Sequence, residues 1–91
     1  MKFMATWKMP PDSQLTAKER FLSAGAPMPE GLKMLGRWHA PGSTSGFLLV
    51  EADDLTPLAT HMVEWGDLLE LQVTPVLEDA EAGEAMAKGK S

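Results

Sequence analysis

The sequence has 91 residues, of which 44% are hydrophobic and 23% are charged, a composition typical of one small folded domain. A formal net charge of −5, with basic residues scattered singly, argues against nucleic acid and anionic membranes as partners. The absence of cysteine excludes disulfides, thiolate zinc sites and thiol catalysis.

The N-terminal segment lacks the apolar core of a signal peptide, and no apolar run reaches the roughly 20 residues of a membrane span. We therefore expect a cytoplasmic protein without a membrane partner. A chain of this size buries only about 60–65% of the surface that it exposes when unfolded, so burial against a partner would add stability.

The first half of the chain contains two alternating segments around one helical segment. Met1–Met9 alternates apolar and polar residues until two prolines, which cannot donate to a sheet, and predicts a strand. A helix is expected from about Gln14 to Ala24, before Gly25, since glycine is typical of a helix C-cap. After a proline-rich loop, a second strand is expected from Leu32 to about Ala40.

The second half repeats the order of strand, helix and strand. A third strand is expected from about Gly46 to Asp53, and Thr56 before a proline is typical of a helix start. Apolar residues at helical spacing continue this helix to Gly66, and Leu68–Glu78 alternates as a fourth strand. The remainder is small, polar and interrupted by glycine, which predicts a frayed helix or a disordered tail.

The resulting β-α-β-β-α-β order is typical of a ferredoxin-like α+β protomer. Such a protomer has a four-stranded antiparallel sheet with two helices on one face. We expect this domain to cover residues 1–79, followed by the polar C-terminal tail over residues 80–91.

The hairpin between the second and third strands decides which side chains share a face of the sheet. If Ala40 and Gly46 are opposed across a five-residue loop, Trp38 pairs with Leu48 on the face that the helices cover. On the first strand, Trp7 suits the helix side. The open face then carries Met4, Leu35, Arg37, His39, Phe47, Leu49, Glu51, Leu68, Glu70, Gln72 and Thr74.

This open face is too apolar to be exposed to solvent and too polar to be buried without hydrogen-bonding or charged partners. A second copy of the same sheet, packed across a two-fold axis, would cover its apolar side chains and pair with its polar ones. We therefore expect a homodimer.

The segments GRWH, GFLLVEADD and LELQVTPVLE resemble an uncharacterised family of small bacterial proteins in the dimeric α/β-barrel superfamily. The resemblance covers the chain to about Glu78 and implies a ferredoxin-like protomer whose sheet forms a barrel with its mate. The superfamily includes antibiotic-biosynthesis monooxygenases, haem-degrading enzymes, muconolactone-isomerase-like enzymes and stress-responsive proteins, so the fold does not define the function. This chain has no asparagine and no tyrosine, so the asparagine-containing sites of those enzymes do not carry over.

Arg37, His39 and Glu51 are the candidate catalytic residues, because strand alternation places all three on the barrel-facing side. A guanidinium can bind a carboxylate or enolate, and an imidazole can carry a proton near neutral pH. The simpler interpretation is an ion pair between Arg37 and Glu51 beside a satisfied histidine at a dimer interface.

Further candidate pocket residues surround this trio. They are Trp7, Phe47, Leu49, Glu70 and Gln72. Glu70 and Gln72 suit equally well a polar rim at the edge of a dimer interface, and Trp7 suits the core. His61 is a further candidate for a haem or metal ligand, but two histidines without cysteine or a carboxylate cluster do not form a recognisable ligand set. We expect no metal and no cofactor.

The sequence favours binding of a small, partly apolar or anionic molecule in a barrel formed by a homodimer. One alternative is a cofactor-independent monooxygenase or isomerase in which His39 acts as a base. Another is a structural or regulatory dimer without a ligand. The sequence leaves open whether the protein is an enzyme.

Overall fold

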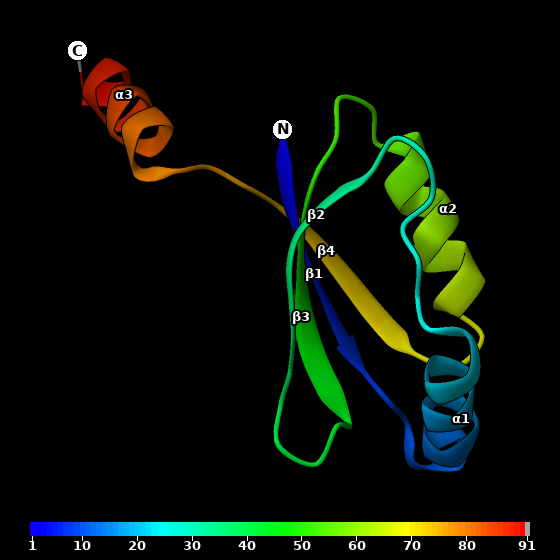
Figure 1. Cartoon of the computed structure of the whole chain (residues 1–91). Helices are drawn as coiled ribbons and strands as arrows, with labels where there is room; N and C mark the ends of the chain where they lie inside the picture. The colour runs from blue at the N-terminus through cyan, green and yellow to red at the C-terminus, as the bar shows by residue number, and fades with distance from the viewer. Residues whose placement is uncertain (91) are drawn as a thin grey trace.

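A computed structural model describes residues 1–90 and contains one four-stranded antiparallel sheet in the order β2-β3-β1-β4. The elements are β1 (Lys2–Lys8), a 3₁₀ turn η1 (Pro11–Ser13), α1 (Gln14–Ala24), β2 (Lys33–His39), β3 (Ser45–Glu51), α2 (Thr56–Trp65), β4 (Glu70–Val76) and α3 (Asp79–Lys90). Helices α1 and α2 lie along the same side of the sheet (Figure 1). The predicted ferredoxin-like β-α-β-β-α-β fold is confirmed.

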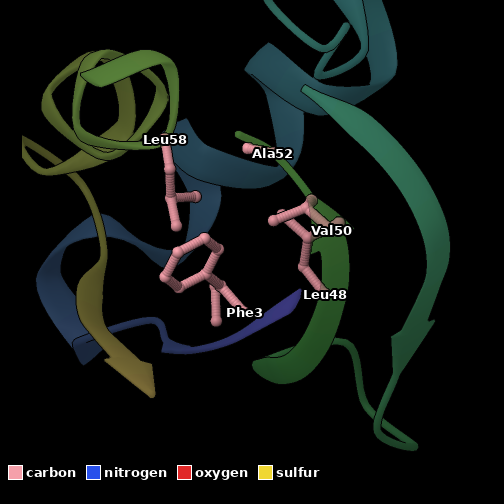
Figure 2. Close-up of a cluster of buried hydrophobic side chains, with 6 residues drawn as sticks. Phe3, Leu48, Val50, Ala52 and Leu58 are labelled. Carbon is pink, nitrogen blue, oxygen red and sulfur yellow. The ribbon is translucent and has the colours of Figure 1, made fainter. Parts of the chain in front are cut away.

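The hydrophobic core lies between the central strands and α2. It consists of Phe3, Ala5, Leu48, Val50, Ala52 and Leu58, most of which Figure 2 labels. Val50 and Leu58 are fully buried, and burial of side chains of this size contributes about 1.5–3 kcal/mol each to stability. The N-terminal strand β1 is central in the sheet, because it pairs with β3 on one side and with β4 on the other.

The turn between β2 and β3 is tighter than the sequence analysis assumed. Pro41 and Gly42 occupy its centre, and the N–H of Ser43 donates to the carbonyl oxygen of Ala40 at 2.8 Å. Gly42 has a φ of 94°, a conformation that glycine adopts without steric cost. The N–H of Ala40 then donates to the carbonyl oxygen of Ser45 at 2.9 Å, so the loop is one residue shorter than expected.

This shorter loop shifts the pairing of β2 by one residue and exchanges the faces of its C-terminal half. The observed pairs are Arg37 with Leu48, Trp38 with Phe47 and His39 with Gly46. Arg37 and His39 therefore point to the helix side, and Trp38 points to the open face. The expectation that Arg37 and His39 lie on the open face, with Trp38 toward the helices, is wrong.

A bulge at Leu35, between Met34 and Gly36, interrupts the pairing of β2 with β3. A Cβ atom on Gly36 would overlap the indole ring of Trp38, so glycine at this position leaves room for that ring on the open face. Before the bulge, Lys33 lies opposite Glu51 on the open side.

The other three strands have the predicted faces. On β3, Leu48 and Val50 are buried toward the helices, whereas Phe47 is exposed on the open side. The registers of β1 with β3 and β4 place Glu70, Gln72 and Thr74 on that same open side.

The segment after β4 forms α3, which extends away from the sheet and the other helices (Figure 1). It buries no residue, and Lys88 forms an ion pair with Glu84 one helical turn earlier at 2.8 Å. The predicted tail over residues 80–91 is thus helical to Lys90, and Ser91 lies outside the described residues. Among residues 1–90, no helix has both the length and the apolar character needed to cross a membrane.

Gly46 provides a test of the packing between β3 and β1. A Cβ atom on Gly46 would overlap the ring of Trp7 and approach the carbonyl oxygen of Trp38 to 2.5 Å. We expect Gly46→Ala to lower the free energy of unfolding by about 1–3 kcal/mol in urea denaturation, because the sheet must shift. Gly83→Ala is the control, since a Cβ there meets nothing within 4 Å. Equal stability of the two variants would contradict this packing.

Candidate functional site

A cavity of about 510 Å³ lies between the helix-covered face of the sheet and the helices α1 and α2. This volume is within the range of small-molecule sites, roughly 300–1,000 Å³. Its apolar lining consists of Ala5, Trp7, Met9, Ala17, Phe21, Leu22, Ala26, Leu48, Met62, Trp65, Leu69 and Leu71. Every strand and both helices that cover the sheet contribute to it.

The cavity exists because α1 covers the sheet without packing closely on it. Ala17 is the buried residue of α1, whereas Leu15 and Leu22 are strongly exposed. Polar contacts hold the helix instead, one at its N-terminus and one near its middle. The hydroxyl of Ser13 donates to the carbonyl oxygen of Leu68 at 2.7 Å, and a bidentate pair joins Arg20 on α1 to the segment after α2.

The bidentate pair is formed by the Arg20 guanidinium and the Asp67 carboxylate, with contacts of 3.1 and 2.7 Å. Arg20 also donates to the carbonyl oxygen of Glu64 at 3.1 Å and lies 5.1 Å above the ring of Trp65. The hydrogen bond from Arg20 lowers the pKa of Asp67 below its ordinary value. These contacts fix the position of α1 beside Trp65, which is part of the cavity wall.

The polar lining of the cavity is basic. It consists of Lys18, Arg37, His39, Ser43 and His61. Among residues 1–90, no aspartate or glutamate lines this cavity, although the whole chain carries a net charge of −5. Two cationic side chains, Lys18 and Arg37, therefore lie within apolar walls without a carboxylate, an arrangement that favours an anionic ligand.

Arg37 is held in place at the cavity wall. Its Nη1 donates to the carbonyl oxygen of Ala26 at 2.9 Å, and its guanidinium lies 5.2 Å from the centre of the Phe21 ring. Within the described part of the chain, Arg37 forms no ion pair with a carboxylate. A guanidinium has five N–H donors, so most of them are available to a ligand.

His39 lies at the exposed mouth of the cavity. Its ring makes edge-on contacts with Trp7 and Phe21, at centroid distances of 5.4 and 5.3 Å. These two aromatic rings hold the imidazole in a position that reaches both the solvent and the cavity.

His61 lies in the cavity wall on the buried side of α2. It is 4% exposed and is flanked on the same helix face by the buried residues Leu58 and Trp65. Its Nδ1 has no hydrogen-bond partner within residues 1–90. Burial lowers the pKa of His61 below 6.5, with Glu64 opposing this shift and Arg37 reinforcing it. The imidazole is therefore neutral at neutral pH.

The predicted catalytic trio is divided between the two faces of the sheet. Arg37 and His39 line the cavity, whereas Glu51 lies on the open face and pairs with Lys2 at 3.6 Å. The expected ion pair between Arg37 and Glu51 is not formed, because the one-residue shift turned Arg37 away from Glu51. Of the other predicted pocket residues, Trp7 lines the cavity, and those on the open face are Phe47, Leu49, Glu70 and Gln72.

Several cavity residues were missed by the sequence analysis. Among them are Lys18, Phe21 and Leu71, and His61 was considered only as a haem or metal ligand. A usable signal existed for His61, which is three residues after Leu58 and four before Trp65 and therefore shares their helix face. A histidine within an apolar helix stripe indicates a buried imidazole beside the core. In residues 1–90, no group of three or more histidine and acidic side chains could hold a metal ion.

The fold and the cavity together define a ferredoxin-like α+β protein with a basic, largely apolar cavity between its sheet and helices. The chain belongs to the family described as Domain of unknown function (DUF3303), whose model matches residues 1–90. Its structure is similar to that of Rv0793 from Mycobacterium tuberculosis, with a TM-score of 0.50 and 13% sequence identity. The similarity covers 87% of this chain and 96% of Rv0793, and at this identity it shows a shared fold. No curated protein matches the sequence.

The buried imidazole of His61 predicts a loss of stability in weak acid. The pKa of His61 is lowered in the folded state, so below about pH 6.5 the unfolded chain binds a proton that the folded chain does not. We expect the free energy of unfolding to decrease from about pH 7.5 to about pH 5.5, and less steeply in His61→Gln. Urea denaturation at each pH measures this slope. His39→Gln retains His61 and is the control, and parallel slopes for wild type and His61→Gln would refute the assignment.

Proposed function

We propose that this protein binds a small, partly apolar organic anion in the cavity between its sheet and the helices α1 and α2. The observation that carries this proposal is the absence of any aspartate or glutamate from the lining formed by residues 1–90, in a chain whose net charge is −5. Apolar walls would take the hydrocarbon part of the ligand, and the basic side chains would take its charge.

In this proposal Arg37 anchors the anion. Its hydrogen bond to Ala26 and its contact with Phe21 hold the guanidinium in one orientation, which reduces the entropy lost on binding. Guanidinium to carboxylate hydrogen bonds are charge-assisted and roughly twice as strong as neutral ones. His39 donates a second hydrogen bond from the mouth of the cavity, and Trp7 forms part of the wall.

An enzymatic use of the same cavity, as a cofactor-independent monooxygenase or isomerase, is the second candidate. The observation that favours it is the exposed position of His39 between Trp7 and Phe21. An imidazole there can take a proton from a bound acid and exchange it with solvent, as a general base must.

We further propose that the protein forms the homodimer of the dimeric α/β-barrel superfamily through the open face of the sheet. Trp38 and Phe47, which pair with each other on that face, are 54% and 50% exposed. An apolar patch of this kind on a small sheet is typical of a protein interface. In such a dimer, Glu70 and Gln72 form part of the polar rim, and Glu51 remains paired with Lys2.

The anion proposal is tested by comparing a charged ligand with a neutral one. We expect isothermal titration calorimetry to show binding of 2-naphthoate by the wild type and about tenfold weaker binding by Arg37→Gln, because a charge-assisted pair is lost. Binding of the uncharged 2-naphthamide should change much less. Lys33→Gln removes the same charge from the exposed open side of β2 and is the matched control.

Equal affinity of wild type and Arg37→Gln for 2-naphthoate would contradict the role of Arg37. If neither compound binds the wild type, a structural or regulatory dimer without a ligand becomes the better interpretation.

The dimer proposal is tested by placing charge on the open face. We expect sedimentation to show a dimer for the wild type at micromolar concentrations and a folded monomer for Phe47→Glu, because a buried unpaired carboxylate opposes association. Val63→Glu on the exposed side of α2 is the control and should remain dimeric. A wild type that sediments as a monomer at every micromolar concentration would overturn the proposal.

A further inference from the structure

His61 has no evident role in folding. Among residues 1–90 it is the one polar or charged residue that is buried, and its Nδ1 has no hydrogen-bond partner. A buried polar atom without a partner is unfavourable, whereas an apolar side chain of similar size would incur no such cost. The neighbouring buried positions of α2 are indeed apolar, namely Leu58 and Trp65.

The unpaired imidazole forms part of the wall of the proposed binding cavity. Arg37 lines the same cavity, so both groups face the space in which the ligand is proposed to bind. A ligand that binds Arg37 and fills this cavity therefore also contacts the wall formed by His61. The two groups differ in what they recognise, because Arg37 is a permanent cation.

A neutral imidazole has one N–H donor and one nitrogen acceptor. Such a group forms good hydrogen bonds with an uncharged hydroxyl or carbonyl. Its hydrogen bond to a carboxylate is weaker than that of a guanidinium. Because Nδ1 is fully buried, a ligand in the cavity meets the imidazole at its other ring nitrogen, Nε2, which is not among the fully buried unpaired atoms of residues 1–90. This nitrogen matches a second, uncharged polar group on the ligand.

We infer that His61 is a specificity-determining residue, and that the cavity selects acids that carry a hydroxyl or carbonyl group in addition to the carboxylate. The carboxylate binds to Arg37, the hydroxyl or carbonyl pairs with the His61 imidazole, and the hydrocarbon frame fills the apolar walls. This inference rests on the proposed binding of an organic anion and names the class of acid that the site prefers.

The test compares acids that differ by one hydroxyl group. Isothermal titration calorimetry measures the binding of 2-naphthoate and of its 5-, 6- and 7-hydroxy derivatives to the full chain. We expect at least one hydroxy acid to bind the wild type about tenfold more tightly than 2-naphthoate, which is the gain from one hydrogen bond to a buried partner.

Substitution of His61 should remove this preference without abolishing binding of the plain acid. His61→Leu is expected to bind 2-naphthoate at least as well as the wild type does and to show no preference for the hydroxy acids. His61→Gln keeps a donor and an acceptor and should retain part of the preference. Val63→Ala, on the exposed side of the same helix, is the control and should behave as the wild type.

Equal binding of all four acids by the wild type would overturn the role of His61 and leave the proposed function standing. Failure of every acid to bind would overturn the proposed function, and the inference with it. If His61→Leu does not fold, nitrogen-15 NMR of the wild type gives the answer, because the chain has only two histidines and His39→Gln assigns their signals. Identical His61 signals with 2-naphthoate and the hydroxy acids would overturn the inference.

Discussion

The turn at Pro41 and Gly42 is the constraint on which the cavity depends. Proline presets the first turn position and glycine supplies the positive φ of the second, so the hairpin closes between Ala40 and Ser45. Because side chains alternate along a strand, this closure directs Arg37 toward the helices. One residue more in the loop would turn this cation to the open face and leave the cavity without its anchored charge.

The two helices that line the cavity contribute differently to stability. The buried face of α2 packs Leu58 against the core and stabilises the fold through apolar burial. Helix α1 buries little more than Ala17 and is held chiefly by the hydrogen bonds of Ser13, at its N-terminus, and of Arg20, near its middle. Had α1 packed as closely as α2, its side chains would occupy the space in which we propose that the ligand binds.

The fold was predictable because its signals are local. Alternation defined the strands, and Gly25 and Thr56 marked helix ends within a residue or two of their observed positions. The site was not fully predictable, because the apolar character of Trp38 favoured burial and suggested the wrong register. The turn geometry, rather than the hydrophobicity of the strand, decides that register. The cavity depends on the distance between α1 and the sheet, which no local pattern encodes.

Two glycines leave room for tryptophan rings on the two faces of the sheet. The ring of Trp38 occupies the space beside Gly36 on the open face, and the ring of Trp7 occupies the space beside Gly46 on the helix side. The contact of Trp7 with Gly46 depends on the register of β1 with β3, whereas Gly36 and Trp38 lie on one strand and keep their contact in any register. The pairing of Trp38 with Phe47 requires the observed register of β2 with β3. The same pairing that turns Trp38 toward the proposed dimer interface turns Arg37 toward the proposed ligand. The two proposed functions of the sheet, association on one face and anion binding on the other, therefore depend on one register.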